Sequence, residues 1–319
     1  MKGLIFSEGN GYGHAARDRL LSGHFNFPIM TFGKGAEYCR KNSMDFIEIP
    51  SPYRILSEKG KVKIATDYNG LMELFQPGVF AQISRHFEKV DTIIVDGSPL
   101  GLAGAMLSRK KAIFITNDVS AMVGVQGAMR KRAAYSLLMS LLKFPKAIIV
   151  PDFPPPLTVS MKNLRTSLPL SFCGPLIEKV AQKKHGKKYV VAGPVEKLVR
   201  PFLGEKAIYA SDVEDIRAYF ANAELIISHG GHTTLMEALS FGKPALCIVD
   251  GDYQERMNNA LQLEKNNVGI MLEKHLLSAE SLSASIEYAK TLSRERLDIY
   301  RKYAQKSEPL KAIEKCLQG

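Results

Sequence analysis

The stretch LIISHGGHTTLMEAL, residues 225–239, decides the fold of this 319-residue chain. Its apolar start, Leu225–Ser228, predicts a buried strand, and the residues after the glycine pair open a helix expected over Thr233–Phe241. A strand that runs through Gly230-Gly231 into a helix is half of a βαβ unit. Because bare backbone N–H groups and the helix dipole converge at this turn, it favours a phosphate.

The residues around the glycine pair strengthen this interpretation. Thr233 and Thr234 add hydroxyl donors to the turn, and Glu237, one helical turn further on, faces the same end and is a candidate ligand for a ribose. A plain capping role for Thr234 does not account for a glycine pair with His229 before it and His232 after it. We therefore predict an anion-binding helix start.

Short apolar runs alternate with helical patterns on both sides of this motif. Further strands are expected at Lys2–Phe6, Pro28–Phe32, Asp45–Ile49, Thr92–Val95, Ala112–Thr116, Ala147–Val150, Tyr189–Ala192, Ala207–Tyr209 and Ala245–Val249. Helices are expected at Leu100–Ser108, Met122–Leu142 and Val213–Phe220, and throughout most of the tail from Ala279 to Gln318. This alternation is typical of parallel βαβ units, so we predict an α/β fold with doubly wound sheets.

Length and proline content indicate two domains. A chain of 319 residues is long for one domain, and Pro151, Pro154, Pro155 and Pro156 form a stiff connection near its middle. We place an N-terminal domain at residues 1–170 and a C-terminal domain at residues 171–319, with a last helix able to pack back on the first domain.

The charge balance favours anionic partners. The 43 Lys and Arg residues exceed the 32 Asp and Glu residues and give a formal charge of +11. This fits nucleic acid, an acidic lipid surface or a phosphorylated small molecule, but the basic residues are dispersed and no nucleic-acid motif is visible. We therefore expect no nucleic-acid partner.

Cysteine usage and hydropathy indicate the cytoplasm. The 4 cysteines are scattered without a CxxC pair, so we expect no disulfide framework and no metal site. No apolar run reaches the roughly 18–20 residues of a membrane span, and no signal-peptide core follows Met1. The apolar segment Ala133–Phe144, preceded by the basic Arg130–Arg132, leaves two interpretations open: a core helix, or a helix lying on an anionic membrane surface.

The sequence SEGNGYGH, residues 7–14, follows the first strand. Gly11 and Gly13 let a ligand or its phosphate approach the backbone, but the spacing does not fit GxGxxG, which weakens a dinucleotide-dependent oxidoreductase. His14 lies at the carboxyl edge of the expected sheet, where such folds bind ligands. It is a candidate general base, although a histidine that only packs on the loop stays an alternative.

A carboxylate ends another strand of the same sheet. Asp96, in IIVDGSPLG, is placed to accept the imidazole N–H of His14 and so to orient the ring. Capping of the next helix is the alternative role, and Asp118, after the following strand, is a competing candidate. In the second half, the polar loop Asp250–Glu255 is suited to sugar hydroxyls, with Gln254 and Glu255 as candidate ligands.

Together these segments resemble the GT-B glycosyltransferases. The likeness is strongest to family 28 and the nucleotide-sugar glucuronosyl- and glucosyltransferase group. It rests on GYGH at Gly11–His14, DGSP at Asp96–Pro99, Gly174-Pro175-Leu176, the run SHGGHTTLMEALSFGKP at Ser228–Pro244, and Gln254 with the later NALQLEK. It spans most of the chain.

The resemblance implies two Rossmann-like domains facing across a cleft. It implies an inverting, metal-independent transfer from a UDP-sugar, bound mainly by the C-terminal domain, to an acceptor hydroxyl bound by the N-terminal domain. It assigns the base to His14, its orientation to Asp96 and the ribose to Glu237. It assigns the diphosphate to Gly230, Gly231, His232, Thr233 and Thr234, and the donor sugar to Gln254 or Glu255. No cofactor is implied beyond the UDP-sugar co-substrate.

Two departures from the family pattern matter. The stretch from Gly174 to His229 is short by about one βα unit, so we expect a shortened C-terminal domain, and Gly193-Pro194 is a poor substitute for the usual glycine-rich turn. Tyr253 before Gln254 leaves the loop register uncertain. A nucleotide-sugar 2-epimerase and a non-catalytic nucleotide-sugar-binding protein remain alternatives. The basic charge makes a lipid-linked acceptor, and with it a membrane-associated enzyme, a further hypothesis.

Overall fold

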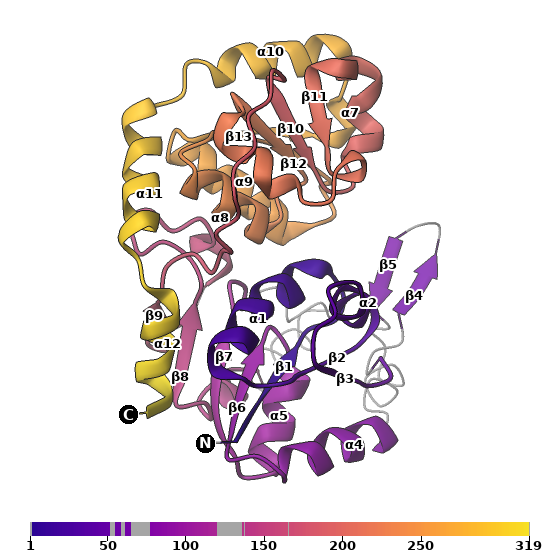
Figure 1. The fold of residues 1–319 in the computed structure, drawn as a ribbon, viewed down its shortest axis with the longest axis vertical. Coiled ribbons are helices and arrows are strands. Elements are labelled where there is room, and N and C mark those ends of the chain that lie inside the picture. Colours follow the sequence, from indigo (N-terminus) through magenta and orange to yellow (C-terminus); the bar gives the residue numbers. More distant parts are fainter. Residues whose placement is uncertain are drawn as a thin grey trace. The chain divides into compact units, whose positions relative to one another are not determined.

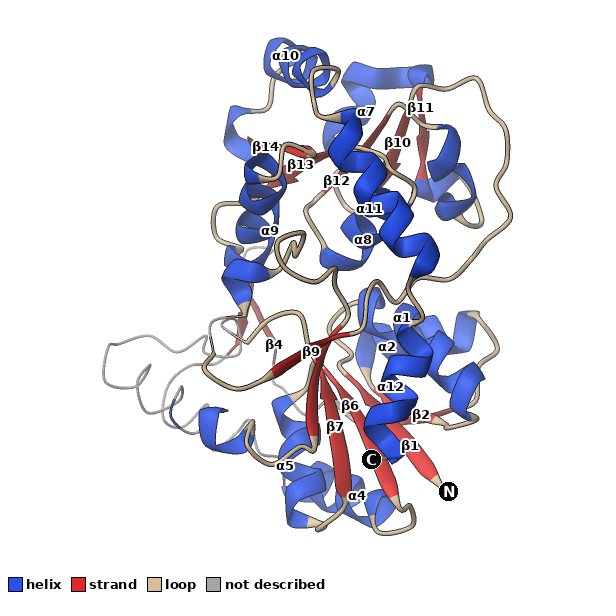
Figure 2. Cartoon of the chain, turned by 90° about the vertical axis from the view of Figure 1, so that its left-hand side faces the viewer, coloured by secondary structure: helices blue, strands red, loops and turns tan. Residues whose placement is uncertain are grey.

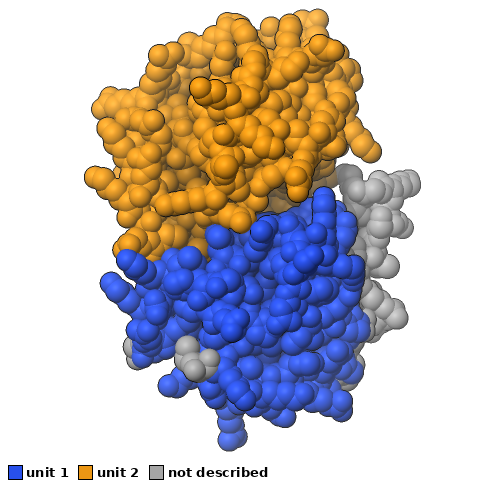
Figure 3. Space-filling view, viewed as in Figure 1, with its two compact units in different colours: residues 1–150, 166–171, 310–319 blue, residues 151–165, 172–309 orange. Residues whose placement is uncertain are grey.

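A computed structural model describes residues 2–51, 55–58, 61–64, 77–119, 136, 138–164 and 166–318. The chain forms two compact units, shown in blue and orange in Figure 3. Unit 1 comprises Met1–Val150, Thr166–Ser171 and Leu310–Gly319, and unit 2 comprises Pro151–Arg165 and Phe172–Pro309. The short segment 151–165 therefore packs with unit 2 although the chain returns to unit 1 directly after it.

Unit 1 is built on a seven-stranded sheet with the order β3-β2-β1-β6-β7-β8-β9 (Figure 1). The strands are β1 (Gly3–Ser7), β2 (Ile29–Thr31), β3 (Phe46–Glu48), β6 (Thr92–Asp96), β7 (Lys111–Ile115), β8 (Ala147–Val150) and β9 (Leu170–Phe172). Neighbours from β3 to β8 pair in parallel. Strand order reverses between β1 and β6, which makes that position the switch point of the sheet.

Helices cover both faces of this sheet (Figure 2). They are α1 (Tyr12–Phe25), α2 (Gly33–Lys41), α4 (Pro77–Phe87) and α5 (Pro99–Leu107), and a short antiparallel pair, β4 (Ile55–Glu58) and β5 (Lys61–Ile64), stands apart from it. Parallel strands covered on both faces consist of continuous apolar runs, and Phe6, Ile94 and Phe114 are accordingly fully buried. The terminal helix α12 (Pro309–Gln318) lies beside α1, where Glu314 pairs with His24 at 3.7 Å.

Unit 2 contains a five-stranded parallel sheet with the order β11-β10-β12-β13-β14. Its strands are β10 (Tyr189–Ala192), β11 (Ala207–Tyr209), β12 (Leu225–Ser228), β13 (Ala245–Val249) and β14 (Gly269–Glu273). The order corresponds to 2-1-3-4-5, whereas the sheet of unit 1 begins with the longer order 3-2-1-4-5-6. In the described residues, unit 2 thus lacks the outermost strand of the longer plan, in agreement with the expected shortening.

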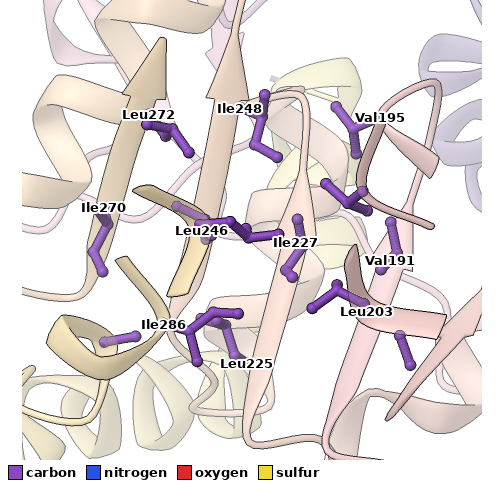
Figure 4. Packing of buried hydrophobic residues seen from close by; sticks show 14 of the residues in the cluster. Val191, Val195, Leu203, Leu225, Ile227, Leu246, Ile248, Ile270, Leu272 and Ile286 are labelled. Carbon is purple, nitrogen blue, oxygen red and sulfur yellow. The ribbon is translucent and has the colours of Figure 1, made fainter. Parts of the chain in front are cut away.

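Two apolar layers hold the unit 2 sheet between helices. On one face, α7 (Glu196–Leu203) and α10 (Ala279–Ala289) contribute Leu203 and Ile286 to a cluster with Ile227 and Leu246 of the sheet (Figure 4). On the other face, α8 (His232–Ser240), α9 (Gln254–Lys265) and α11 (Arg294–Lys306) pack against the strands. Burial of both faces fixes the turns at the carboxyl ends of the strands.

The predicted α/β class and doubly wound sheets are confirmed, and the strands predicted from apolar runs agree with the structure at most of their ends to within one residue. The helix expected at Val213–Phe220 is wrong in kind: Ile216–Asn222 is a 3-10 helix, begun by the side chain of Asp215, which accepts a bond from Arg217 N. Strands β4, β5, β9 and β14 were not predicted.

Most of the segment from Met122 to Leu142, including Arg130–Arg132, lies outside the described residues. In its described part, Leu138 and Leu142 are buried, which is the behaviour of core side chains. Among the described residues, no helix has the length and apolar character that crossing a membrane would require.

Candidate functional site

The carboxyl edge of the unit 1 sheet places His14 and Asp96 side by side. Asp96 is the last residue of β6 and pairs in register with Ser7 of β1, while His14 stands in the first turn of α1. The two residues therefore flank the switch point, where doubly wound sheets bind their ligands. His14 Nδ1 lies 2.9 Å from Asp96 Oδ1.

The two side chains differ in solvent exposure, so only one of them can meet a substrate. Asp96 is fully buried, whereas the His14 side chain is 27% exposed. In the tautomer that protonates Nδ1, the ring donates to Asp96 and keeps Nε2 available to accept a proton. Gly97, at φ +73°, passes directly under the ring, and a Cβ there would collide with it. The geometry thus fits an oriented base.

Arg17, which the sequence analysis did not single out, completes this cluster. Its Nε donates to Asp96 Oδ2 at 2.5 Å, its Nη2 bonds to Asp96 Oδ1, and its Nη1 donates to Asn117 at 3.2 Å. Nη2 also lies 3.0 Å from His14 Nδ1. Burial opposes ionisation of Asp96, but Arg17 and then His14 outweigh it and hold the pKa of this carboxyl well below its usual range.

A second carboxyl lies behind this cluster. Asp18 is fully buried, and burial together with the charge of Asp96 raises its pKa well above the usual value. The two buried carboxyls are therefore shifted in opposite directions, Asp18 upward and Asp96 downward. Asp118, the competing candidate, follows β7, where its backbone exchanges hydrogen bonds with the hydroxyl of Thr116.

The glycine loop before α1 is open on one side. Gly11 precedes the helix in an extended conformation without a side-chain cap, and nothing lies within 4 Å of a Cβ built on it. The free N–H groups at this helix start and the space beside Gly11 are compatible with an acceptor or a phosphate near Gly13.

The corresponding edge of unit 2 is built from backbone. The switch point lies between β10 and β12, and the turns after both strands carry a glycine with positive φ: Gly193 at +85° and Gly230 at +80°. The ring of His229 lies against Gly193 and Gly231. A Cβ on Gly193 would lie 2.7 Å from His229 Nδ1, and one on Gly231 would lie 3.0 Å from Nε2. A single glycine thus forms the turn for which a glycine-rich loop was expected.

His229 is neutral in this position. Burial, and then the charge of Arg256, lowers its pKa to about 4. Its Nδ1 is buried and has no hydrogen-bond partner among the described residues. The ring therefore supplies an unused polar atom at the same edge as the glycine turns.

The start of α8 presents free donors beside this ring. Gly231 precedes the helix without a side-chain cap, and the first bond of the helix start runs from Leu235 N to Gly231 O at 3.2 Å. The N–H groups of His232, Thr233 and Thr234 therefore have no acceptor within the helix. The residues predicted to bind a phosphate therefore lie close together. Their N–H groups lie at the N-terminus of α8, which is the positive end of the helix dipole.

The side chain of His232 has a different task from its backbone. It is 4% exposed, and its Nε2 lies 3.2 Å from the fully buried Asp152. Asp152 also accepts bonds from the backbone of Phe153 and Val159 and from Ser160, whose Oγ lies at 2.6 Å. His232 thus anchors the helix start to segment 151–165, and only its N–H is available to a ligand.

Glu237 lies on α8 near a second charged cluster. Arg217 makes ion pairs with Asp215 at 2.7 Å and with Glu178 at 3.0 Å. Burial raises the pKa of Glu237 to about 7, Arg217 opposes this shift, and the carboxylates of Asp215 and Glu178 add to it. Glu237 is therefore a carboxyl that titrates near neutral pH and can accept or donate a hydrogen bond.

A chain of side-chain amides connects the loop at α9 to the glycine turn. Gln254 Nε2 donates to Asn258, which donates to Asn163 at 2.7 Å; Asn163 then donates to Asn259 at 2.9 Å. Asn259 donates to Gly230 O at 3.1 Å. The candidate sugar ligand Gln254 and the glycine turn are thereby held in one network, next to the half-buried Glu255.

Several residues of these clusters were missed from sequence. Arg17, Gly97 and His229 each adjoin a residue that was singled out, but their roles depend on ring positions that no spacing reveals. Among the described residues, no group of three or more His, Cys, Asp or Glu side chains is placed to hold a metal ion.

The sequence of this chain is similar to that of known proteins. Residues 181–316 match the model of the glycosyltransferase family 28 C-terminal domain. A Methanosarcina mazei protein described as an uncharacterized glycosyltransferase is 27% identical over 328 residues, which cover 84% of this chain and 85% of the relative. A protein of Methanosarcina acetivorans with the same description is 25% identical and covers 85% of this chain and 86% of its own length.

Solved structures share the fold over the whole chain. The crystal structure of MurG from Acinetobacter baumannii has a TM-score of 0.62 at 13% identity and covers 100% of this chain and 99% of that one. CalG4, the calicheamicin glycosyltransferase, has a TM-score of 0.64 at 14% identity with coverages of 100% and 98%. The spinosyn rhamnosyltransferase SpnG, complexed with thymidine diphosphate, has a TM-score of 0.62 at 12% identity and covers both chains fully, at 100% each.

Proposed function

We propose that this chain, which has the GT-B fold, is a glycosyltransferase that transfers a sugar from a UDP-sugar to an acceptor hydroxyl with inversion. The observation that carries this proposal is the contact between His14 and the buried Asp96 at the switch point of unit 1. A partly exposed imidazole fixed by a carboxylate is the arrangement expected of a general base.

The reaction is a direct displacement in this proposal. His14 Nε2 accepts the proton of the acceptor hydroxyl, the hydroxyl oxygen bonds to the anomeric carbon, and the bond from that carbon to the phosphate oxygen breaks. UDP leaves with the bonding electrons. Because Asp96 is buried behind His14 and bound by Arg17, it is not available as a nucleophile, which supports inversion in a single step.

Unit 2 supplies the stabilisation of the leaving group. The N–H groups of His232, Thr233 and Thr234 and the dipole of α8 favour the negative charge that grows on the diphosphate. Glu237 is proposed to bind the ribose, and Gln254 or Glu255 the sugar. The chemistry assigned to these residues requires no bound metal.

A transfer assay with His14→Ala tests the proposal. Panels of UDP-sugars and of lipid-phosphate and small hydroxyl acceptors are incubated with the wild type, and released UDP and glycosylated product are measured together. We expect the variant to lose about 10²–10⁴-fold in turnover while UDP binding, measured by calorimetry, is unchanged.

His24→Ala is the matched control, because His24 stands on the same helix and pairs only weakly with Glu314. It should keep wild-type turnover. Retained turnover in His14→Ala would remove His14 as the base. A wild type that binds no nucleoside diphosphate would overturn the proposal as a whole.

A further inference from the structure

Arg256 lies against the glycine turn of unit 2 and has no role in the assignments above. It stands in the first turn of α9, and a Cβ built on Gly230 would lie 3.1 Å from Arg256 O and 3.3 Å from Arg256 Cβ. The bond from Asn259 to Gly230 O fastens the same helix to the same turn. Arg256 therefore starts directly beside the free donors of α8.

The guanidinium of Arg256 is held by a ring and not by a carboxylate. Its Cζ lies 3.9 Å from the ring centroid of Tyr253, which is 46% exposed. Stacking occupies the faces of the planar group and leaves the N–H donors at its edge available for two parallel bonds to an anion. In the part of the chain that the structure describes, Arg256 makes no ion pair with a carboxylate.

Two other arginines of unit 2 differ in this respect. Arg217 is occupied by Asp215 and Glu178, and Arg200 is paired with Asp212 at 2.8 Å. The charge of Arg256 reaches the glycine turn, because it contributes, after burial, to the lowered pKa of His229. An unpaired cation, a neutral imidazole and free backbone donors thus surround one turn.

We propose that Arg256 binds the diphosphate of the donor and neutralises the charge that develops on the leaving group, with Tyr253 positioning its guanidinium. This inference rests on the proposed function, since it takes the turn at Gly230 as the diphosphate site. A helix start carries only about half a positive charge, whereas a diphosphate carries more than one negative charge. Arg256 supplies the remaining cation at that site.

Binding measurements with the full chain test this assignment. Calorimetry with uridine, UMP, UDP and TDP is carried out on the wild type, Arg256→Ala, Arg256→Lys and Tyr253→Ala. We expect Arg256→Ala to weaken UDP binding about 10- to 100-fold and uridine binding less than twofold, because the lost bonds are to phosphate. Arg256→Lys should recover part of the affinity, and Tyr253→Ala should lose about threefold.

Arg294→Ala is the matched control, since Arg294 is an exposed arginine at the first residue of α11 and its loss changes the net charge equally. It should bind UDP like the wild type. If the wild type binds UDP and Arg256→Ala binds it equally well, or loses uridine to the same degree, the role of Arg256 is overturned and the proposed function stands. A loss seen with UDP-glucuronate but not with UDP would also overturn it, because Arg256 would then recognise the sugar carboxylate. Absence of nucleotide binding by the wild type instead removes the proposed function.

Discussion

The switch points of the two sheets occupy equivalent places and are built from opposite materials. In unit 1, the edge is formed by the polar side chains of His14, Arg17 and Asp96, which bond to one another. In unit 2, the edge is formed by Gly193, Gly230 and a helix start whose first N–H groups have no acceptor within the helix.

The difference corresponds to two kinds of chemistry. Proton transfer needs a base whose tautomer and direction are fixed, so its partners must be buried and satisfied before substrate arrives. Anion binding needs donors without partners of their own, together with glycines that let the ligand come close. One fold thus gives a preorganised base at one sheet edge and an open cradle at the other.

The largest expected effect is at the charged edge. Asp96→Asn removes the negative charge that faces the buried Arg17 and replaces one of the two acceptor oxygens by an N–H donor, which disturbs the bonds to Arg17 and His14. Breaking a buried pair in this way costs about 3–5 kcal/mol, and we expect turnover to fall about 100-fold or more. Urea unfolding followed by circular dichroism, together with initial rates, measures both effects.

Asp212→Asn is the control for this prediction. Asp212 also faces an arginine, Arg200, but their side chains are 49% and 44% exposed, so the same substitution should change the free energy of unfolding little and leave turnover intact. Equal destabilisation by the two variants would show that the unit 1 cluster is no more preorganised than a surface pair.

Much of this fold follows from periodicity, and the reason is visible in its strands. Thr92–Asp96 and Leu225–Ser228 are covered on both faces, so nearly every residue in them must be apolar, and the turns that follow bear the polar groups. The meeting of His14 with Asp96 could be expected because carboxyl ends of parallel strands share an edge.

The remainder depends on distances that sequence spacing does not encode. The contact of His232 with Asp152 joins residues 80 positions apart, and that of Arg17 with Asp96 joins residues 79 apart. Gly193 departs from the longer glycine motif of the family, and the need for a glycine there depends on the ring of His229, which leaves no room for a Cβ. Strand β14 contains an apolar run, but it was overlooked after the more conspicuous α9.

UDP binding at the unit 2 edge should also depend on the backbone geometry of its glycine turn. Gly230→Ala places a methyl group 3.1 Å from Arg256 O at a φ of +80°, so the turn must shift. A residue with a Cβ in this region costs about 1–2 kcal/mol, and we expect UDP affinity to fall about tenfold while the fold persists. Calorimetry with UDP measures the loss.

Gly204→Ala separates backbone strain from damage to the site. Gly204 also has a positive φ, +48°, but nothing lies within 4 Å of a Cβ built there. It should lower the melting temperature slightly and leave UDP affinity unchanged. If both variants bind UDP alike, the turn at Gly230 does not contact the diphosphate.

The smallest effect is a dependence on pH at Glu237, the one candidate ligand of unit 2 whose charge changes near neutrality in our assignments. Its pKa of about 7, raised from 4.5, means that the folded chain holds a proton between these values which the unfolded chain has released. The contribution of this group to stability is therefore lost as pH rises from about 4.5 to about 7.

Donor affinity should change in the opposite direction. An ionised carboxylate accepts hydrogen bonds from ribose hydroxyls more strongly than a neutral carboxyl, so donor affinity should fall severalfold as pH falls from 8 to 6. UDP-glucose is the probe for calorimetry, because its esterified diphosphate does not titrate in this range, and His229, with a pKa of about 4, stays neutral throughout. Glu237→Gln should make affinity independent of pH, whereas Glu205→Gln, at an exposed glutamate of the same unit, should keep the wild-type profile. A profile that survives in Glu237→Gln would assign the proton to another group, and the charge of Glu237 would then have no part in donor binding.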